Sequence, residues 1–167
     1  MERKTVWKLF FVWDFEKEEA WLNEMAAQGW VLCNVGYCRY EFERCDPDSY
    51  VIRLEMHSPD EEYIRFMTET GAEYIGRVIQ WIYFRKAAEL GPFDLFSDID
   101  SRISHLKRIS RTLLVIALIN LMLGVINSQG YSHLGWVNLL VASLLTYGLG
   151  RIHGKTEVLE KERQLRE

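Results

Sequence analysis

The sequence predicts an α+β fold, in which a domain of two repeated strand–helix–strand halves precedes a stalk helix and an apolar helical hairpin. Two observations predict it. The pattern W-L-x-x-M-x-x-x-G at residues 21–29 recurs as Y-I-x-x-M-x-x-x-G at residues 63–71, a shift of 42 residues. In addition, residues 112–127 and 134–150 contain no Asp, Glu, Lys or Arg, whereas the rest of the chain is rich in charge.

Each half of the repeat has the pattern of a strand, a helix and a second strand. Acidic residues stand at the starts of the two expected helices, and Gly29 and Gly71 can cap their ends. Two such halves predict a ferredoxin-like βαββαβ domain over residues 1–90. The expected elements are strands at 6–13, 31–44, 50–56 and 73–86 and helices at 16–28 and 59–70.

Strand alternation assigns one face of the predicted sheet to the helices and leaves the other face open. The residues expected on the helix-facing side are Phe10, Val12, Tyr40, Phe42, Ile52, Leu54, Ile82 and Phe84. A mixture of aromatic residues and arginines on the open face favours a surface for partner binding or self-association. The alternative is a solvated face on which charged side-chain stems cover the rings. The candidate binding residues are Phe11, Trp13, Arg39, Arg53, Trp81, Tyr83 and Arg85.

The two charge-free stretches predict a two-helix transmembrane hairpin over residues 112–152. A linker and amphipathic stalk helix at residues 91–111 would precede it, and a charged tail at residues 153–167 would follow. Basic residues flank the outer ends of the hairpin, so the positive-inside rule places both termini in the cytoplasm of a multi-pass cell-membrane protein. The alternative is a pair of buried helices in a soluble domain.

Two polar residues lie inside the predicted hairpin. Asn120 falls near mid-membrane, at about the depth expected for Ser143 on the second helix. An unpaired amide is costly in lipid, so we expect these two side chains to form an intramembrane hydrogen bond between the helices.

The composition argues against several functions. Lys and Arg number 20 against 24 Asp and Glu, and the net charge of -4 disfavours a nucleic-acid partner. Cys33, Cys38 and Cys45 are expected to be reduced thiols of a cytosolic domain, and their spacing is not that of a zinc site. The sequence contains no phosphate-binding loop, GxSxG or HExxH motif, so no catalytic residue, cofactor or enzyme activity is predicted.

One run of the sequence resembles a known family signature: residues 13–30 read WDFEKEEAWLNEMAAQGW. Together with the matches YEF at residues 40–42, WIYFRK at 81–86 and FSDI at 96–99, this run resembles the bacterial family called domain of unknown function 2812. The resemblance implies a membrane-associated protein of Firmicutes-like bacteria, encoded near PadR-like transcription regulators. It implies no known activity and supplies no catalytic residues.

These observations favour a membrane-anchored regulatory or sensory protein, whose cytosolic domain binds a protein partner or a second copy of itself through the open sheet face. One alternative is a module that senses a small amphipathic ligand. The other is an accessory subunit of a transporter. In each case the lipid bilayer is an expected partner.

Overall fold

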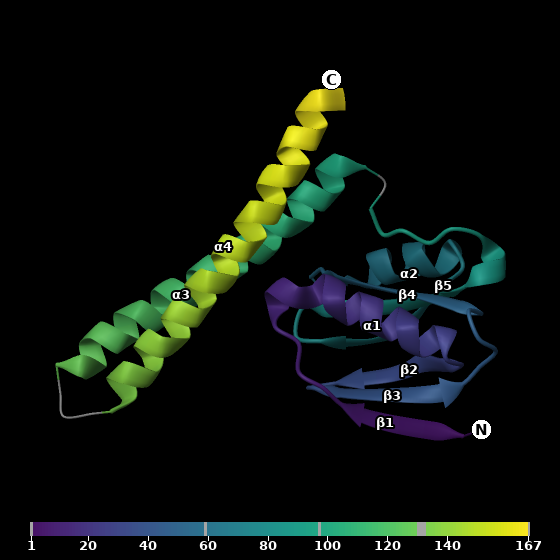
Figure 1. Cartoon of the computed structure of the whole chain (residues 1–167), viewed down its shortest axis with the longest axis horizontal. Helices are drawn as coiled ribbons and strands as arrows, with labels where there is room; N and C mark the ends of the chain where they lie inside the picture. Colours follow the sequence, from purple (N-terminus) through teal and green to yellow (C-terminus); the bar gives the residue numbers. More distant parts are fainter. Residues whose placement is uncertain (1, 59, 97, 130–132, 167) are drawn as a thin grey trace. The chain divides into compact units, whose positions relative to one another are not determined.

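The computed structural model describes residues 2–58, 60–96, 98–129 and 133–166. The chain divides into two compact units, Met1–Ser97 and Asp98–Glu167, and each is described by itself (Figure 1). The fold is α+β, as predicted.

The first unit contains two three-stranded antiparallel sheets. Sheet A has the strand order β1-β3-β2 and sheet B the order β4-β6-β5. Two short 3₁₀ turns, η1 (Val12–Asp14) and η2 (Ala88–Leu90), accompany the helices. The main elements are β1 (Arg3–Trp7), α1 (Phe15–Ala27), β2 (Trp30–Gly36), β3 (Arg39–Arg44), β4 (Tyr50–Met56), α2 (Glu61–Glu69), β5 (Ala72–Val78) and β6 (Trp81–Ala87).

The predicted ferredoxin-like βαββαβ order is not confirmed. Each predicted second strand is instead a hairpin, because residues 31–44 divide into β2 and β3 and residues 73–86 into β5 and β6. Both hairpin turns place a non-glycine residue at positive φ, Cys38 at 54° and Ile79 at 57°. Such turns usually carry Gly, Asn or Asp at these positions, so the usual sequence signal is missing.

The 42-residue repeat is present in the structure. Gly29 and Gly71, both at positive φ, follow the two helices, and a β-bulge falls at the same place in each half, between Leu32 and Asn34 and between Tyr74 and Gly76. Only glycine adopts the positive φ found after each helix at little cost.

The first strand breaks the repeat. Val6 pairs with Tyr40, and Glu55 pairs with Ile82. The partner residues are 42 apart, but Val6 and Glu55 are 49 apart, so the first half has seven extra residues between its first strand and its helix. The predicted strand at residues 6–13 therefore ends at Trp7, and Trp13 lies in η1.

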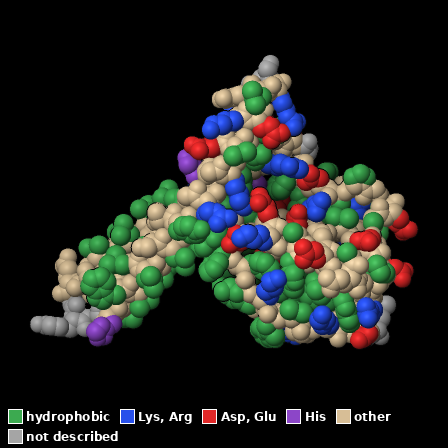
Figure 2. All heavy atoms as spheres, viewed as in Figure 1, with side chains coloured by type: hydrophobic (Ala, Val, Ile, Leu, Met, Phe, Trp, Pro, Cys, Tyr) green, Lys and Arg blue, Asp and Glu red, His purple; other side chains and the backbone are tan. Residues whose placement is uncertain are grey.

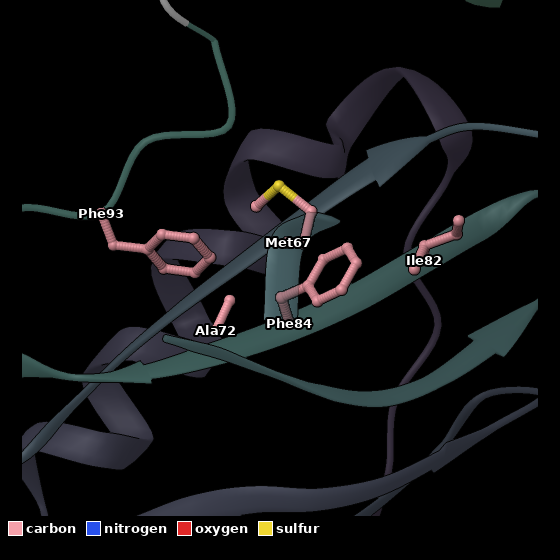
Figure 3. Packing of buried hydrophobic residues seen from close by; sticks show 5 residues of the cluster. All are labelled: Met67, Ala72, Ile82, Phe84 and Phe93. Atoms are coloured by element: carbon pink, nitrogen blue, oxygen red, sulfur yellow. The ribbon is translucent and has the colours of Figure 1, made fainter. Parts of the chain in front are cut away.

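Each helix covers the sheet of its own half. On sheet A the Trp21 ring of α1 meets the rings of Tyr40 and Phe42 edge-on, with centroids 5.0 and 5.7 Å away. On sheet B, α2 and the segment after β6 enclose a core that includes Ile82 and Phe84 (Figure 3). The predicted helix-facing positions of Tyr40, Phe42, Ile82 and Phe84 are thus confirmed. The core of sheet B consists of Met67, Ala72, Ile82, Phe84 and Phe93.

The face predicted for β4 is wrong, because Ile52 pairs with Arg85 and Leu54 with Tyr83, so both lie on the face opposite Phe84. Arg53 pairs with Phe84 and lies on the α2 side instead. Phe10 and Val12 fall outside the first strand.

Helix α1 also seals the free edge of β4, an outer strand of sheet B. The Asn23 side chain donates to the carbonyl of Ile52 at 2.9 Å and accepts from the N–H of Ile52 at 3.0 Å. The N–H of Leu54 donates to the Glu19 carboxylate at 3.2 Å. These side chains take the place of a neighbouring strand, which is one way of protecting a sheet edge.

We predict that Asn23→Leu destabilises the first unit by about 2 kcal/mol, because it leaves both backbone groups of Ile52 without partners in a half-buried position. Urea unfolding of the full chain, followed by tryptophan fluorescence, measures the change. The control is Gln28→Leu at an exposed position just after the same helix, where we expect at most about 0.5 kcal/mol. Equal losses in the two variants would contradict the edge-sealing role of Asn23.

The second unit is a helical hairpin of α3 (Ile99–Ser128) and α4 (Leu134–Arg166). Ion pairs between Lys107 and Glu160 and between Asp100 and Arg163, at 2.8 and 2.9 Å, join the start of α3 to the end of α4, so the helices run antiparallel. Small residues line the contact: a Cβ added to Gly124 would lie 2.8 Å from the Leu139 side chain. Such close approach is typical of helices that pack in membranes.

The two-span prediction is supported for one helix. Among the described residues, α3 alone is long and apolar enough to cross a membrane, and α4 does not reach the same hydropathy. Helix α4 is less apolar because glycines, Asn138 and the basic residues from Arg151 onward interrupt it. The predicted stalk is the first part of α3, and the predicted charged tail, as far as Arg166, is the last part of α4.

The predicted hydrogen bond between Asn120 and Ser143 is not present. Asn120 Nδ2 donates to the carbonyl of Ile116 at 2.9 Å, and Ser143 Oγ donates to the carbonyl of Leu139 at 2.9 Å. Each side chain therefore donates to the carbonyl four residues earlier in its own helix. The depth of a residue in the predicted hairpin does not reveal this local alternative.

Candidate functional site

The predicted open sheet face is largely covered. Trp13, Trp81 and Tyr83 are only 4, 9 and 4% exposed, and only Phe11 and Arg39 of the predicted binding residues are well exposed. The cause is that sheet B has neighbours on both faces. The Phe15 ring of α1 lies 5.5 Å from the Trp81 ring, on the face opposite α2. Binding of a partner by these seven residues stays a prediction.

Arg53 and Arg85 are half-buried and paired within the first unit. Arg53 donates to the carbonyl of Phe93 at 3.0 Å and to Glu19 at 3.3 Å. Arg85 pairs with Glu43 and Glu73, each at 2.8 Å. Since Glu43 belongs to β3 and Glu73 to β5, Arg85 links sheets A and B and has a structural role.

A buried carboxylate, that of Glu18 on α1, lies between the two sheets. Glu18 is 8% exposed. Its Oε1 atom accepts two hydrogen bonds, one from the hydroxyl of Tyr40 in β3 at 2.7 Å and one from the hydroxyl of Tyr83 in β6 at 2.6 Å. One oxygen atom therefore joins the helix, sheet A and sheet B.

Burial raises the pKa of Glu18, and the hydrogen bonds from Tyr83 and Tyr40 oppose that increase by stabilising the charged form. Burial and the neighbouring Glu18 raise the pKa values of both tyrosines above their usual range. Both phenols therefore keep their protons at neutral pH and remain donors. The trio is a carboxylate with an elevated pKa held by two neutral hydroxyl donors.

Glu18 also lines a cavity of about 140 Å³. Three segments form its walls: residues 8–15, the β2–β3 turn and the β5–β6 turn. The exposed side chains of Leu9, Tyr37 and Ile79 belong to the same lining. The aromatic lining residues are Phe10, Phe11, Phe15, Tyr37, Tyr40, Trp81 and Tyr83.

One lining residue of the cavity, Lys8, lies over two aromatic rings. Lys8 Nζ lies 4.8 Å from the centre of the Phe10 ring and 4.3 Å from the centre of the Trp21 ring. Both distances are typical of cation–π interactions.

The three cysteines are free thiols of intermediate burial. Cys33 lies at the bulge in β2 and donates to the carbonyl of Glu41, whereas Cys38 lines the cavity. In the part of the chain that the structure describes, no three of the residues His, Cys, Asp and Glu are grouped in a way that could hold a metal ion.

Glu18 was not among the predicted site residues, because the sequence assigns it to the acidic start of a helix. A usable signal was present. Glu18, Leu22 and Met25 follow the spacing i, i+4, i+7, so the carboxylate stands on the apolar stripe of α1. A carboxylate on such a stripe indicates either a buried network or a functional group.

The fold and the site together define a class of protein: a duplicated α+β unit with a carboxylate-bearing aromatic pocket, joined to a helical hairpin. A family model described as a protein of unknown function, DUF2812, matches residues 14–118. The chain belongs to this family. The match begins at η1 and extends into α3. No curated protein and no solved structure matches the chain.

We predict that Glu18→Gln changes how stability depends on pH. Because the pKa of Glu18 is raised in the folded state, that state binds more protons than the unfolded chain above the ordinary glutamate pKa, so its free energy of unfolding falls as pH rises. Glutamine removes this contribution. From about pH 4 to about pH 8 the variant should lose less stability than the wild type.

Urea unfolding at a series of pH values provides the measurement. Glu19, whose pKa burial also raises, is present in both proteins and cancels in the comparison. Glu24→Gln, at an exposed position of the same helix, serves as the control. Parallel pH profiles for the wild type and Glu18→Gln would contradict the burial of a titrating carboxylate.

Proposed function

We propose that the chain is a membrane-anchored sensory protein, and that its first unit binds a small amphipathic ligand in the cavity beside Glu18. The carrying observation is the combination of an aromatic-lined cavity with one buried carboxylate at its wall. Small-molecule sites are typically concave and apolar, with a few polar groups that fix the ligand's orientation.

Burial of the predicted binding face favours a ligand over a flat partner surface. A protein partner cannot contact the buried side chains of Trp81 and Tyr83 without separating the sheets, whereas a small molecule can enter between the two hairpin turns. A ligand there would touch residues of both sheets. Its binding energy would act on the relation between the halves of the repeat, which is what a sensor requires.

A second candidate function is the binding of a protein partner at the rim of the cavity. Leu9, Tyr37 and Ile79 are exposed large apolar residues that line the cavity. Exposed apolar residues around a pocket are also found at interaction sites. Regulation through a partner and ligand sensing could share this rim.

The membrane anchor rests on the second unit. Helix α3 can span a membrane by length and composition, and most of its apolar side chains between Leu114 and Ile126 are exposed in the hairpin. Figure 2 shows hydrophobic side chains over the part of the hairpin near its connection, and charged ones gathered at the opposite end. We propose that α3 and α4 both enter the lipid, with the two termini in the cytoplasm, because the basic residues flank the outer ends.

We predict that filling the cavity abolishes ligand binding without unfolding the protein. Val78 opposes Trp81 across the β5–β6 ladder and lines the cavity, so Val78→Trp should occupy it. Screening the full chain in non-ionic detergent with small amphipathic molecules of positive, neutral and negative charge should identify at least one that raises its melting temperature. A ligand at 100 times its dissociation constant adds about 2.7 kcal/mol.

The matched control is Arg77→Trp, since the exposed neighbour of Val78 points to the other face of the strand. It should retain the ligand-induced increase in melting temperature, and Val78→Trp should lose it. A screen in which no molecule shifts the wild type, or in which both variants respond like the wild type, would refute the proposed pocket.

We predict that the connection of the hairpin lies outside the cell. In a chain with Cys33, Cys38 and Cys45 replaced by serine, Gln129→Cys should react with a membrane-impermeant thiol reagent added to intact cells. Leu165→Cys, an exposed position near the end of α4, should react only after the cells are opened. Protection of both positions, or labelling of both from outside, would contradict the proposed topology.

A further inference from the structure

We infer that the cavity beside Glu18 takes an amphipathic organic cation, with the Glu18 carboxylate as its counter-ion and the surrounding aromatic rings as its walls. The inference rests on the proposed ligand-binding function and names the chemical class of the ligand.

The state of the carboxylate is the first argument. Glu18 is buried, and the two groups that hold it, the hydroxyls of Tyr40 and Tyr83, are both uncharged. Buried carboxylates are usually paired with a cation, because neutral donors compensate only part of the lost hydration. Both hydroxyls reach the same oxygen, Oε1, so neither occupies Oε2. A ligand cation would supply the missing charge.

The aromatic lining is the second argument. The faces of Phe, Tyr and Trp rings carry partial negative charge and attract cations, most strongly where water is excluded. Lys8 demonstrates this property in the cavity wall, where its ammonium group lies over the ring of Phe10, a lining residue, and over the neighbouring ring of Trp21. The walls nearer Glu18 come from Phe15, Trp81 and the two tyrosines.

Size and rim set the remaining limits on the ligand. A closed cavity of roughly 150 Å³ holds a benzene-sized molecule, so a cavity of about 140 Å³ admits a substituted ammonium group or one ring. The exposed apolar side chains of Leu9, Tyr37 and Ile79 can then cover a hydrophobic remainder. An anion of the same size would meet the Glu18 carboxylate and be repelled.

Proton linkage follows from the same geometry. The titratable or charged groups that line the cavity are Lys8, Glu18, Tyr37, Cys38, Tyr40 and Tyr83. Burial holds the pKa of Glu18 above its usual range, so a permanent cation competes with a proton for this carboxylate. Its affinity should rise with pH until Glu18 is ionised and then level off.

A matched pair of probes tests the inference. Benzyltrimethylammonium carries a permanent positive charge, and 2,2-dimethylpropylbenzene is its uncharged isostere, with carbon in place of nitrogen. Binding of each probe to the full chain in non-ionic detergent is measured by tryptophan fluorescence and calorimetry, for the wild type and Glu18→Gln. Near-ultraviolet circular dichroism checks that the variant retains its fold.

We expect the cation to bind the wild type at least about tenfold more tightly than Glu18→Gln, and the isostere to bind both proteins equally. The inference is overturned if the isostere binds the wild type as tightly as the cation, or if Glu18→Gln binds the cation as well as the wild type does. In either case, sensitivity of binding to Val78→Trp would leave the pocket intact as an apolar ligand site. Failure of both probes to bind overturns the inference. The proposed function is refuted only by the melting-temperature screen described above, if no molecule stabilises the wild type or if Val78→Trp responds like the wild type.

Discussion

The first unit depends on the carboxylate of Glu18, which accepts two tyrosine hydroxyls from different sheets. Each half of the repeat could bury one face of its sheet with its own helix. The second face of sheet B, with Trp81 and Tyr83, is buried because α1 and sheet A lie against it, and Glu18 supplies the polar contact within that layer. The contact carries a cost in hydration, which burial of the aromatic rings offsets.

The pocket lies where the repeat is broken. The seven extra residues between β1 and α1 add the segment that contains Phe10, Phe11 and Val12, and all three line the cavity. In the second half, β4 leads to α2 with no such insertion. Duplication therefore accounts for the frame of the unit, whereas the departure from duplication accounts for its candidate site.

Much of the fold follows from local patterns. The 42-residue repeat, the two helices ended by Gly29 and Gly71, and the helix-facing residues of β3 and β6 could be predicted because each depends on periodicity or on a single backbone conformation. The face of β4 could not, since it depends on the register between β4 and β6. The two hairpins could not, since Cys38 and Ile79 replace the usual turn residues. The covering of sheet B depends on long-range packing between halves, which alternation along one strand does not encode, and for this reason an exposed face was predicted for Trp81 and Tyr83.

For the same reason the site was missed while its parts were visible. In the 42-residue repeat Tyr40 corresponds to Ile82, so Tyr40 and Tyr83 lie on different faces of equivalent strands. Only stacking of the two sheets brings both hydroxyls to one carboxylate. Likewise, Asn120 and Ser143 match in depth but bond within their own helices, because a side chain finds the nearest carbonyl first.

The most direct measurement is a pH titration of the Glu18 carboxyl carbon by ¹³C nuclear magnetic resonance in the full chain, with the signal assigned by its loss in Glu18→Gln. The account predicts a midpoint above the ordinary glutamate value that rises further in Tyr83→Phe and falls when benzyltrimethylammonium is added. A midpoint at the ordinary value, unaffected by either change, would contradict it.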